Sequence, residues 1–270
     1  MHYREDFLRA DVVVFHIPTT PLPLRLPRRP GQAWVAWSME SDVNYPQQRD
    51  PGFMTQFDLT ATYRSDADVT LSYAHPHEWL DFRPAARDPA ARFDPAPAAF
   101  IASSPFDRSG RIEYVRELMR HIEIASYGRV LNNRRLSDDR GPETKLATLA
   151  RHRFTLAFEN SVAVDYVTEK LFESLLAGSV PVYLGAPNVA EHAPAPGCYL
   201  DVSSFSGPAE LAAHLRVLVD DDAAYGRLHE WRERPLEPAF LQRLSEQRAG
   251  LLVRIDQALR ARRHADAGSV

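Results

Sequence analysis

Short apolar runs alternate with stretches of helical spacing in the second half of the chain. Large apolar residues recur through residues 154–158 and a β-rich run follows at 180–184, so both segments are predicted strands. Between them Leu171 and Leu175 lie at helical spacing, and Gly178 supplies a C-terminal stop. The pattern predicts a strand–helix–strand unit, which closes right-handed with parallel strands.

The loop after the first of these strands carries a cluster of polar residues. In a parallel unit, this loop and the start of the helix lie at the carboxyl edge of the sheet, where ligands bind. Asp165 and Thr168 offer side-chain oxygens as helix caps. Free helix N–H groups favour an anion and Lys170 adds a mobile cation, which suits a diphosphate. The polar residues at this edge are Glu159, Asn160, Ser161, Tyr166, Thr168, Glu169 and Lys170.

The same charges also fit a structural interpretation. Glu169 and Lys170 could be ordinary first-turn surface charges, with Lys170 paired to Glu173 three residues further on. From these few residues alone, the structural interpretation is favoured. A longer stretch of sequence is needed to decide between the two.

The first half of the chain also predicts parallel strands. Residues 11–16 contain a continuous apolar run, Val12 to Phe15, typical of a strand buried on both faces, and a loop rich in proline and arginine follows at 17–30. Residues 34–40 predict a second strand that ends in the carboxylate of Glu40. Residues 57–69 precede a third short apolar stretch.

Composition then divides the chain. Prolines and alanines concentrate at residues 83–99 and block regular structure, so this segment is the predicted inter-domain linker. The expected domains are residues 1–98, residues 99–236, and an amphipathic helix with its tail at 237–270. After the linker we expect strands at 100–103, 124–127 and 199–202, and helices at 111–121, at 143–151, from Pro208 and from Asp222.

Length, charge and cysteine content narrow the class of protein. The 270 residues can bury a substantial core in one large or two modest domains. The formal net charge of −4 gives no reason to expect a nucleic-acid partner. The single cysteine, Cys198, excludes an intramolecular disulfide and a cysteine metal cluster, and it is expected to face the core.

The sequence predicts a soluble, cytoplasmic protein. No apolar run approaches the roughly 20 residues that cross a bilayer, and the first residues lack a signal-peptide profile. The C-terminal helix is expected to pack across the two domains. Arginines at 254, 260, 262 and 263 leave peripheral attachment to the inner membrane face, or helix pairing, as secondary alternatives.

Neither a metal site nor a cofactor is expected. Asp220, Asp221 and Asp222 could suggest an Asp-x-Asp metal motif, but they lie between two predicted helices, where an N-cap explains them. His75 and His77 have no partner cluster at ligand spacing. No Gly-x-Gly-x-x-Gly string and no Walker-type loop supports a dinucleotide or phosphate-loop enzyme.

The strings FENS, DYVTEK and LLAGSVPVYLG, in this order, closely resemble the signature region of the α-1,3-fucosyltransferase family. The first half of the chain also has the order of elements that the family shows: a strand ending in His16, a Trp-Val-rich strand ending in Glu40, and then a tyrosine–arginine–aspartate segment. The resemblance therefore covers about Ala10 to Arg234. Enzymes of this family take L-fucose from GDP-fucose and build a glycosidic bond on an acceptor sugar. The resemblance implies a GT-B fold, with two Rossmann-like α/β domains facing across a cleft.

Several residue roles follow from the resemblance. It implies that Arg111 and Lys170 bind the diphosphate, that Glu169 hydrogen-bonds donor hydroxyls, and that Asn160 and Tyr166 line the same site. Each has a simpler alternative. Arg111 could be a solvated surface charge, whereas Asn160 and Tyr166 could cap the loop or pack in the core.

Glu40 is the candidate general base. An inverting sugar transfer needs a carboxylate to take the acceptor proton as its oxygen attacks the anomeric carbon, and the resemblance assigns this role to Glu40. The alternative is a solvated loop residue.

Two departures from the family pattern matter. Relatives have a further strand and helix before the strand that ends in His16, so the N-terminal domain is expected to be reduced. Where many relatives place a second histidine linked to acceptor choice, this chain has Ile17, Pro18 and Thr19, so acceptor specificity does not carry over. Animal relatives usually carry a membrane anchor and disulfides, and this chain resembles the bacterial branch instead.

The resemblance therefore implies inverting, metal-independent transfer of L-fucose from GDP-β-L-fucose to an acceptor glycan. The expected acceptor is an oligosaccharide of the N-acetylglucosamine type, receiving an α-1,3 linkage, with a lipid-linked form as one alternative. Two other functions stay open: a transferase of the same fold that uses another GDP-sugar, and a non-catalytic glycan- or nucleotide-binding module.

Overall fold

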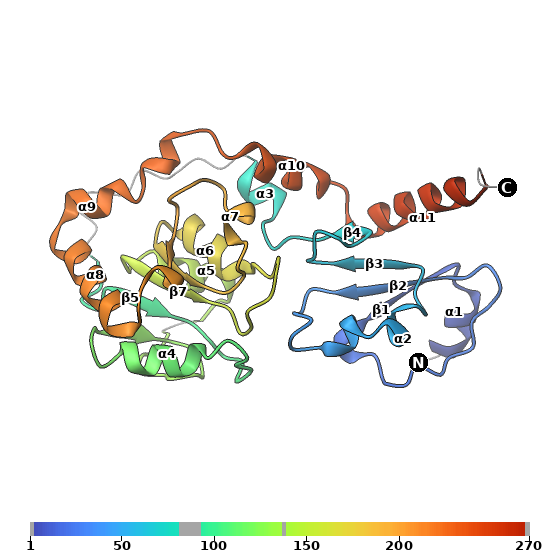
Figure 1. The fold of residues 1–270 in the computed structure, drawn as a ribbon, viewed down its shortest axis with the longest axis horizontal. Coiled ribbons are helices and arrows are strands. Elements are labelled where there is room, and N and C mark those ends of the chain that lie inside the picture. Colours follow the sequence, from blue (N-terminus) through green and yellow to red (C-terminus); the bar gives the residue numbers. More distant parts are fainter. Residues whose placement is uncertain (1–2, 81–92, 137–138, 268–270) are drawn as a thin grey trace. The chain divides into compact units, whose positions relative to one another are not determined.

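The computed structural model describes residues 3–80, 93–136 and 139–267. The chain divides into two compact units. Unit 1 contains residues 1–72 and 246–270, and unit 2 contains residues 73–245 (Figure 1). Unit 1 is therefore built from both ends of the chain.

Unit 1 has a parallel sheet in the order β1-β2-β3-β4, whose register pairs His16 with Trp37 and Val35 with Leu59. Its strands are β1 (Val12–His16), β2 (Ala33–Ser38), β3 (Leu59–Thr62) and β4 (Val69–Thr70). Its helices are α1 (Tyr3–Arg9), α2 (Pro51–Met54) and α11 (Leu251–Ala267), with 3₁₀ turns η1 (Ile17–Thr19) and η2 (Pro46–Arg49).

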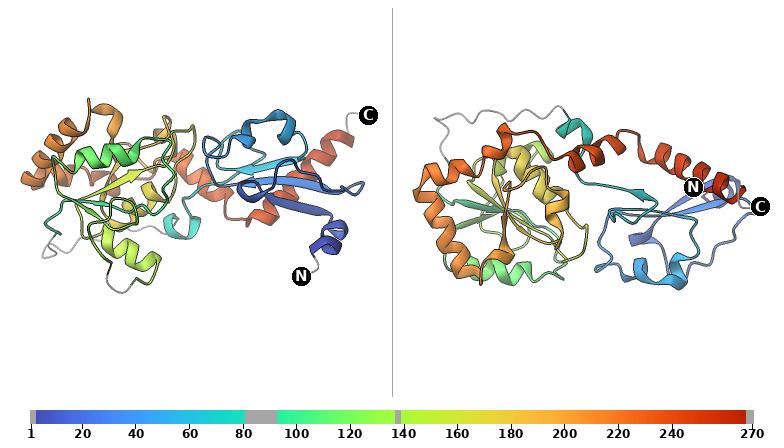
Figure 2. Two further views of the ribbon diagram at one scale, coloured as in Figure 1. Left: turned by 90° about the horizontal axis from the view of Figure 1, so that it is seen from below. Right: turned by 45° about the horizontal axis from the view of Figure 1, so that its top comes forward.

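Both faces of this sheet are covered. Val35 of β2 packs with Ile255 and Leu259 of α11, which runs along one face (Figure 2). Trp34, the preceding residue, points to the other face and packs with Phe57. This alternation is the period-2 pattern of a strand, here apolar on both sides because both sides are buried.

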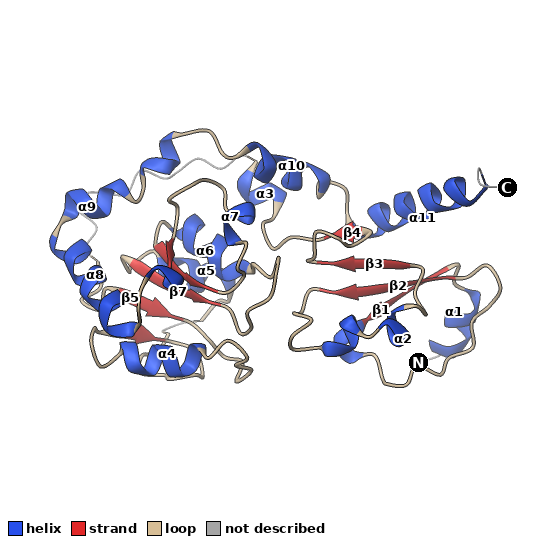
Figure 3. Ribbon diagram, viewed as in Figure 1, coloured by secondary structure: helices blue, strands red, loops and turns tan. Residues whose placement is uncertain are grey.

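Unit 2 has a parallel sheet in the order β6-β5-β7-β8-β9, flanked by helices (Figure 3). Its strands are β5 (Ala98–Phe100), β6 (Ile124–Ser126), β7 (Phe154–Phe158), β8 (Val180–Leu184) and β9 (Leu200–Asp201). Its helices are α3 (Pro76–Trp79), α4 (Arg111–Leu118), α5 (Pro142–Leu149), α6 (Glu169–Ala177), α7 (Val189–His192), α8 (Pro208–Asp220), α9 (Asp222–Arg227) and α10 (Pro238–Glu246), with 3₁₀ turns η3 (Val202–Ser204) and η4 (Glu230–Glu233).

The strand order of unit 2 defines where a ligand can bind. From β5 the sheet grows to β6 on one side and through β7, β8 and β9 on the other. The order therefore reverses between β5 and β7. In open parallel sheets the crevice at the carboxyl ends of two such strands is the usual ligand site. The loops that follow β5 and β7, residues 101–110 and 159–168, flank it.

The central strand–helix–strand unit forms as the pattern predicts. The strands expected at 154–158 and 180–184 are β7 and β8, and α6 ends at Gly178, whose φ of 80° lies in the left-handed region that glycine favours. Helices expected from Pro208 and Asp222 are α8 and α9. These predictions are confirmed.

Other boundaries differ from expectation. The strand expected at 34–40 ends at Ser38, which leaves Glu40 in the loop, and the strand expected at 100–103 is β5 at Ala98–Phe100. The expected linker at 83–99 falls partly outside the described residues, and the compact units divide after Ser72 rather than after residue 98.

The C-terminal amphipathic helix expected at 237–270 is two helices. Leu244 of α10 belongs to the core of unit 2, whereas Ile255 of α11 belongs to the core of unit 1. The chain leaves helical geometry before Gly250, because each half buries its apolar stripe against a different sheet. Within the described ranges, no helix has the length and apolar character of a membrane span.

Candidate functional site

Glu159 is the centre of the site in unit 2. It directly follows β7, its backbone N–H donates to Leu184 O at 2.7 Å, and its side chain is fully buried. The carboxylate accepts hydrogen bonds from the backbone N–H and the hydroxyl of Thr168, each at 2.8 Å, and from Nζ of Lys170 at 3.1 Å. Full burial raises the pKa of Glu159, whereas the Lys170 charge and the two Thr168 donors oppose this shift and favour the ionised form.

Lys170 is held by acceptors on three sides. Besides Glu159, its Nζ contacts Oγ1 of Thr168 at 2.8 Å and Oε1 of Glu169 at 3.2 Å. Burial alone would lower the pKa of Lys170, but the two carboxylates raise it above 10.5. The ammonium is therefore charged at neutral pH and fixed in place, and the expectation of a mobile cation is wrong.

The structural alternative for Lys170 is also wrong in its choice of partner. Glu173 contacts Lys145 of α5 instead. Thr168 occupies the N-cap position of α6, but its hydroxyl donates to Glu159 and makes no cap bond to the helix. The buried carboxylate of Glu159 thus supplies the negative charge that the start of α6 favours.

Gly185 leaves the room that Glu159 needs. A Cβ at this position would lie 2.5 Å from Cγ of Glu159 and 2.5 Å from the hydroxyl oxygen of Tyr183. Real Cβ atoms do not approach that closely, and Glu159 cannot move without breaking its bonds to Thr168 and Lys170. In the sequence, Gly185 directly follows the strand predicted at 180–184.

We expect Gly185→Ala to lower the free energy of unfolding by about 1–3 kcal/mol, the usual cost of overpacking. Urea unfolding measures this cost. The control is Gly226→Ala in α9, where a Cβ meets no atom within 4 Å and alanine is the better helix former. Equal effects of the two substitutions would contradict the close packing at Gly185.

Arg111 lies at the same edge, at the start of α4, and is 2% exposed. Its guanidinium donates to Phe158 O at 3.0 Å, to Ser104 O at 3.1 Å and to Phe106 O at 3.3 Å. It thereby ties the loop after β5 to the end of β7. The solvated surface charge considered as an alternative is wrong, and a diphosphate contact stays a prediction.

The neighbourhood of Arg111 links it to the other candidates. Burial lowers the pKa of Arg111, and the charges of Glu159 and Glu169 oppose this shift. The guanidinium Nε has no hydrogen-bond partner among the described residues. The structure therefore brings Arg111, Glu169 and Lys170 together at one sheet edge, as the sequence predicts.

The remaining donor-side candidates differ in exposure. Glu169 is partly exposed beside Lys170, in a position to meet a ligand. The carbonyl of Asn160 accepts the backbone N–H of Arg108 at 2.7 Å, which joins the two loops. Tyr166 is only 2% exposed, and its carbonyl accepts the hydroxyl of Tyr183 at 3.3 Å. Burial of Tyr166 favours the alternative in which its ring packs in the core.

Glu40 belongs to unit 1, in the loop after β2. Its backbone is fixed: the Glu40 N–H donates to Oγ of Ser38 at 3.1 Å, that hydroxyl donates to Glu40 O at 3.0 Å, and Nε2 of Gln48 also donates to Glu40 O at 3.0 Å. Ser38 is fully buried at the end of the strand. Glu40 therefore sits at the carboxyl edge of its sheet on a rigid turn.

Asp42 anchors the same loop, and sequence reasoning missed it. Its carboxylate accepts two hydrogen bonds from Arg49, both at 2.9 Å, and one from the hydroxyl of Tyr63 at 3.0 Å, and Arg64 lies 3.5 Å away. Asp42 is 3% exposed. The tyrosine–arginine pair of the segment that resembles the family was the available signal.

We expect Asp42→Asn to lower the free energy of unfolding by about 2 kcal/mol at pH 7, the scale of a hydrogen bond to a charged group. Burial would raise the pKa of Asp42, but Arg49, Tyr63 and Arg64 lower it below 3.8. A depressed folded pKa stabilises the protein above the unfolded pKa, and this contribution is lost as the pH falls through the folded pKa.

The difference in the free energy of unfolding between wild type and Asp42→Asn should therefore be largest at pH 7 and should shrink below about pH 4. Urea unfolding over this range measures it. The control is Asp66→Asn, because Asp66 is mostly exposed and an exposed pair contributes about 0–1 kcal/mol. A difference that persists unchanged at pH 3 would contradict an ionised, anchored Asp42.

A cavity of about 730 Å³ adjoins the charged cluster of unit 2. It lies at the carboxyl ends of β5 and β6, lined in part by Tyr127 and Lys145. The Nζ of Lys145 is 4.0 Å from Oε1 of Glu169. The hydroxyl of Tyr127 lies 3.0 Å from Nε2 of His152, a buried side chain that fixes the ring.

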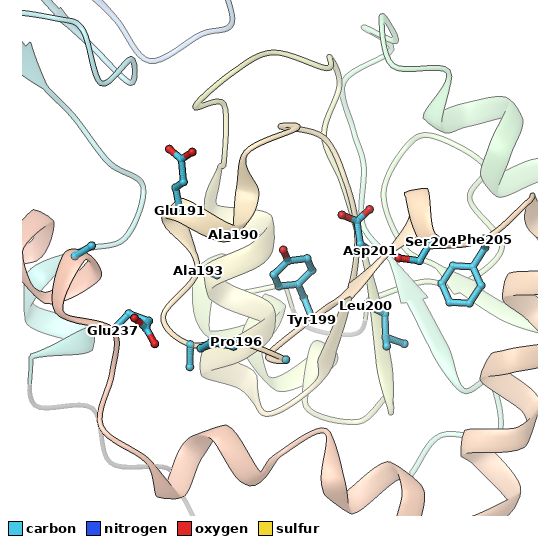
Figure 4. A pocket seen from close by; sticks show the side chains of 13 residues that line it. Ala190, Glu191, Ala193, Pro196, Tyr199, Leu200, Asp201, Ser204, Phe205 and Glu237 are labelled. Atoms are coloured by element: carbon cyan, nitrogen blue, oxygen red, sulfur yellow. The ribbon is translucent and has the colours of Figure 1, made fainter.

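A second cavity, of about 670 Å³, opens beside α7 and β9 (Figure 4). Tyr199, Asp201, Glu191 and Glu237 contribute its polar side chains, and Figure 4 shows them spread around the opening rather than converging. None of the sequence-predicted site residues lines it. In the part of the chain that the structure describes, no group of three or more histidine, cysteine or acidic side chains could hold a metal ion.

Comparison with known proteins agrees with this architecture. The family model for glycosyltransferase family 10 (fucosyltransferase), C-terminal part, matches residues 95–261, and that for the fucosyltransferase N-terminal part matches residues 1–74. A solved alpha1,3-fucosyltransferase with GDP-fucose is similar over 92% of this chain and 78% of its own, with a TM-score of 0.64 and 18% identity. This likeness confirms the expected GT-B-type α/β fold class.

Curated animal proteins are also similar. GDP-fucose protein O-fucosyltransferase 3 of Gallus gallus is 35% identical over 243 residues, covering 84% of this chain and 51% of that protein. The 4-galactosyl-N-acetylglucosaminide 3-alpha-L-fucosyltransferase FUT6 of Homo sapiens is 35% identical over 239 residues, covering 85% and 64%. The chain spans about half the length of the first of these relatives, and the likeness to bacterial enzymes stays a prediction. With a family model matching more than half of its residues, the chain belongs to glycosyltransferase family 10, the fucosyltransferase family.

Proposed function

We propose that this chain transfers L-fucose from GDP-fucose to an acceptor hydroxyl. The observation that carries the proposal is the fixed ammonium of Lys170, held by Glu159, Thr168 and Glu169 at the ligand-binding edge of unit 2. When the bond between fucose and the diphosphate breaks, negative charge grows on the departing GDP. A cation fixed in advance stabilises that charge without further reorganisation.

The donor is proposed to use the cavity next to this cation. A volume of about 730 Å³ is within the range of small-molecule sites. Lys145 lines the cavity and its Nζ lies 4.0 Å from Oε1 of Glu169, so we propose that it is a second cation near the diphosphate. Glu169, partly exposed, is proposed to accept hydrogen bonds from hydroxyls of the fucose ring, with Arg111 and Asn160 fixing the loops on either side.

The proposed chemistry is a single inverting displacement. The acceptor oxygen attacks the anomeric carbon, its proton passes to Glu40, and the bond to the β-linked diphosphate breaks to leave an α linkage. The transition state carries positive charge on the sugar, as in glycoside hydrolysis. Since cations of the protein meet the leaving group, we propose that no metal ion and no cofactor is required.

The proposed acceptor is a glycan of the N-acetylglucosamine type, fucosylated at its 3-hydroxyl. The name of the FUT6 relative, an N-acetylglucosaminide 3-fucosyltransferase, supports this choice. A second candidate is a hydroxyl of a protein, because another relative is named as a protein O-fucosyltransferase. Both candidates use the same donor, and acceptor assays with each class separate them.

Calorimetric titration with GDP-fucose, GDP-mannose and UDP-galactose, in buffer with EDTA, tests the donor. We expect preferential binding of GDP-fucose, and transfer of labelled fucose that EDTA does not reduce. Preference for GDP-mannose would support the alternative of another GDP-sugar. Absence of binding to all three sugar nucleotides would overturn the proposed function.

A further inference from the structure

Asp165 adopts an unusual backbone conformation in the loop before α6. Its φ is +66°, in the left-handed region that L-residues other than glycine rarely adopt, and it is 3% exposed. Such a backbone conformation persists only where the surroundings enforce it. Asp165 immediately precedes the segment 166–170, which carries the fixed ammonium.

The start of α7 enforces this conformation. Oδ1 of Asn188 accepts the backbone N–H of Asp165 at 2.9 Å, and Nδ2 of Asn188 donates to Oδ1 of Asp165 at 2.8 Å. Nε2 of His192 lies 3.0 Å from the same Oδ1. The loop is thus clamped to α7 through both the backbone and the side chain of Asp165.

His192 joins this clamp to α10. Because Asp165 Oδ1 accepts hydrogen bonds, Nε2 of His192 must carry the proton. Its Nδ1 is 3.5 Å from NH1 of Arg243, a donor, so Nδ1 is unprotonated. His192 is therefore a neutral bridge between a carboxylate and a guanidinium. His192 is 8% exposed. The contacts described above for Glu159, Lys170 and Arg111 do not include its ring.

The clamp and Glu159 act on the same short segment. The backbone N–H of Val167 donates to Asp165 O at 2.9 Å, and the N–H of Thr168 donates to Glu159 at 2.8 Å. Asp165 fixes where the segment begins, and Glu159 fixes where α6 starts. Release of Asp165 would free the start of the segment, while Glu159 would still hold Thr168 and Lys170 at its end.

We propose that His192 is a positioning residue for the donor site: through Asp165 it holds segment 166–170 in the conformation that binds the diphosphate. The inference rests on the proposed function. His192 touches no reacting atom, so its effect is on donor affinity more than on the chemical step.

The bridge is sensitive to acid. Three charged groups face His192: Asp165 from the loop, Arg243 from α10 and Glu191 from its own helix. Burial and Arg243 lower the pKa of His192, whereas Asp165 opposes this shift. Protonation places an N–H on Nδ1 against the Arg243 guanidinium. The neutral bridge is therefore complete above the usual histidine pKa and is lost as the pH falls through the lower folded value.

Two substitutions test the role. His192→Ala removes the bond to Asp165, and we expect GDP-fucose affinity to fall about tenfold at pH 7.5 with a rise in KM larger than the fall in kcat. His192→Gln keeps an N–H donor at the position of Nε2 but cannot titrate. It should retain affinity and abolish the loss of affinity that we expect of wild type as the pH falls below 6.5. His214→Ala in α8, an exposed histidine, is the matched control.

Hydrogen exchange without ligand gives a second readout. Peptides covering residues 160–170 should exchange faster in His192→Ala, with protection in β7 and β8 unchanged, and His192→Gln should restore protection. Unchanged exchange in His192→Ala would overturn the positioning role, and this readout needs no ligand. Failure of wild type to bind GDP-fucose would overturn the proposed function instead. Equal donor affinity and equal pH profiles of wild type and His192→Ala would also overturn it.

Discussion

Glu40→Gln is expected to lower kcat by about 10²–10⁴, the usual contribution of general base catalysis, while GDP-fucose affinity stays within twofold. Glutamine keeps the shape of the side chain but cannot take a proton. The hydrogen bonds that fix this loop come from Ser38 and Gln48 to the backbone of residue 40, so the substitution leaves them intact. Folding should therefore be unaffected.

Single-turnover transfer of labelled fucose, compared with calorimetric titration of the donor, separates the two effects. Gln48→Ala is the matched control, because it loosens the backbone of Glu40 without removing the carboxylate. Its rate should fall less than that of Glu40→Gln. If Glu40→Gln retained the wild-type rate, Glu40 would not be the base. If neither wild type nor Glu40→Gln transferred fucose, the non-catalytic binding module would be the better interpretation.

Local patterns in the sequence predict most of this fold. The strands at 154–158 and 180–184 and the C-terminal stop at Gly178 follow from short-range periodicity and backbone preference, and the structure has them at these positions. The carboxyl edge where Arg111 and Lys170 meet follows from parallel topology. These predictions need no knowledge of which residues are buried.

Long-range pairing could not be predicted in the same way. Glu159 was placed at the edge, but the i,i+3 rule for helices pointed Lys170 to Glu173, whereas its partner is eleven residues earlier in the chain. Burial decides the outcome. Glu159 is fully buried and needs a cation, while Glu173 has Lys145 from α5.

The division into units shows a second limit of local reasoning. Composition at 83–99 suggested a linker, yet the chain returns to unit 1 after residue 245. Leu244 and Ile255 continue one helical stripe in sequence but pack against different sheets. Periodicity predicts which side chains are buried, and it does not say against what.

Lys170→Met should remove donor binding, but the result needs a partner variant to be interpreted. The substitution leaves the buried carboxylate of Glu159 without its ammonium, and an unpaired buried charge costs about 3–5 kcal/mol of stability. A loss of GDP-fucose binding in Lys170→Met alone could therefore come from a damaged loop. Glu159→Gln alone raises the opposite problem, because it leaves the ammonium with fewer acceptors.

The double variant Glu159→Gln/Lys170→Met removes both charges together and separates the two roles. Replacing a buried pair by neutral groups of similar volume is often close to neutral for stability, so urea unfolding should show the double variant recovering most of the loss caused by Lys170→Met. Donor affinity should not recover, because the diphosphate still lacks its cation. We expect kcat to stay about 10²–10³ below wild type, the scale of one lost electrostatic contact in a transition state. Recovery of both stability and donor affinity would mean that Lys170 serves only to neutralise Glu159, and Lys145 and Arg111 would then have to carry the charge of the diphosphate.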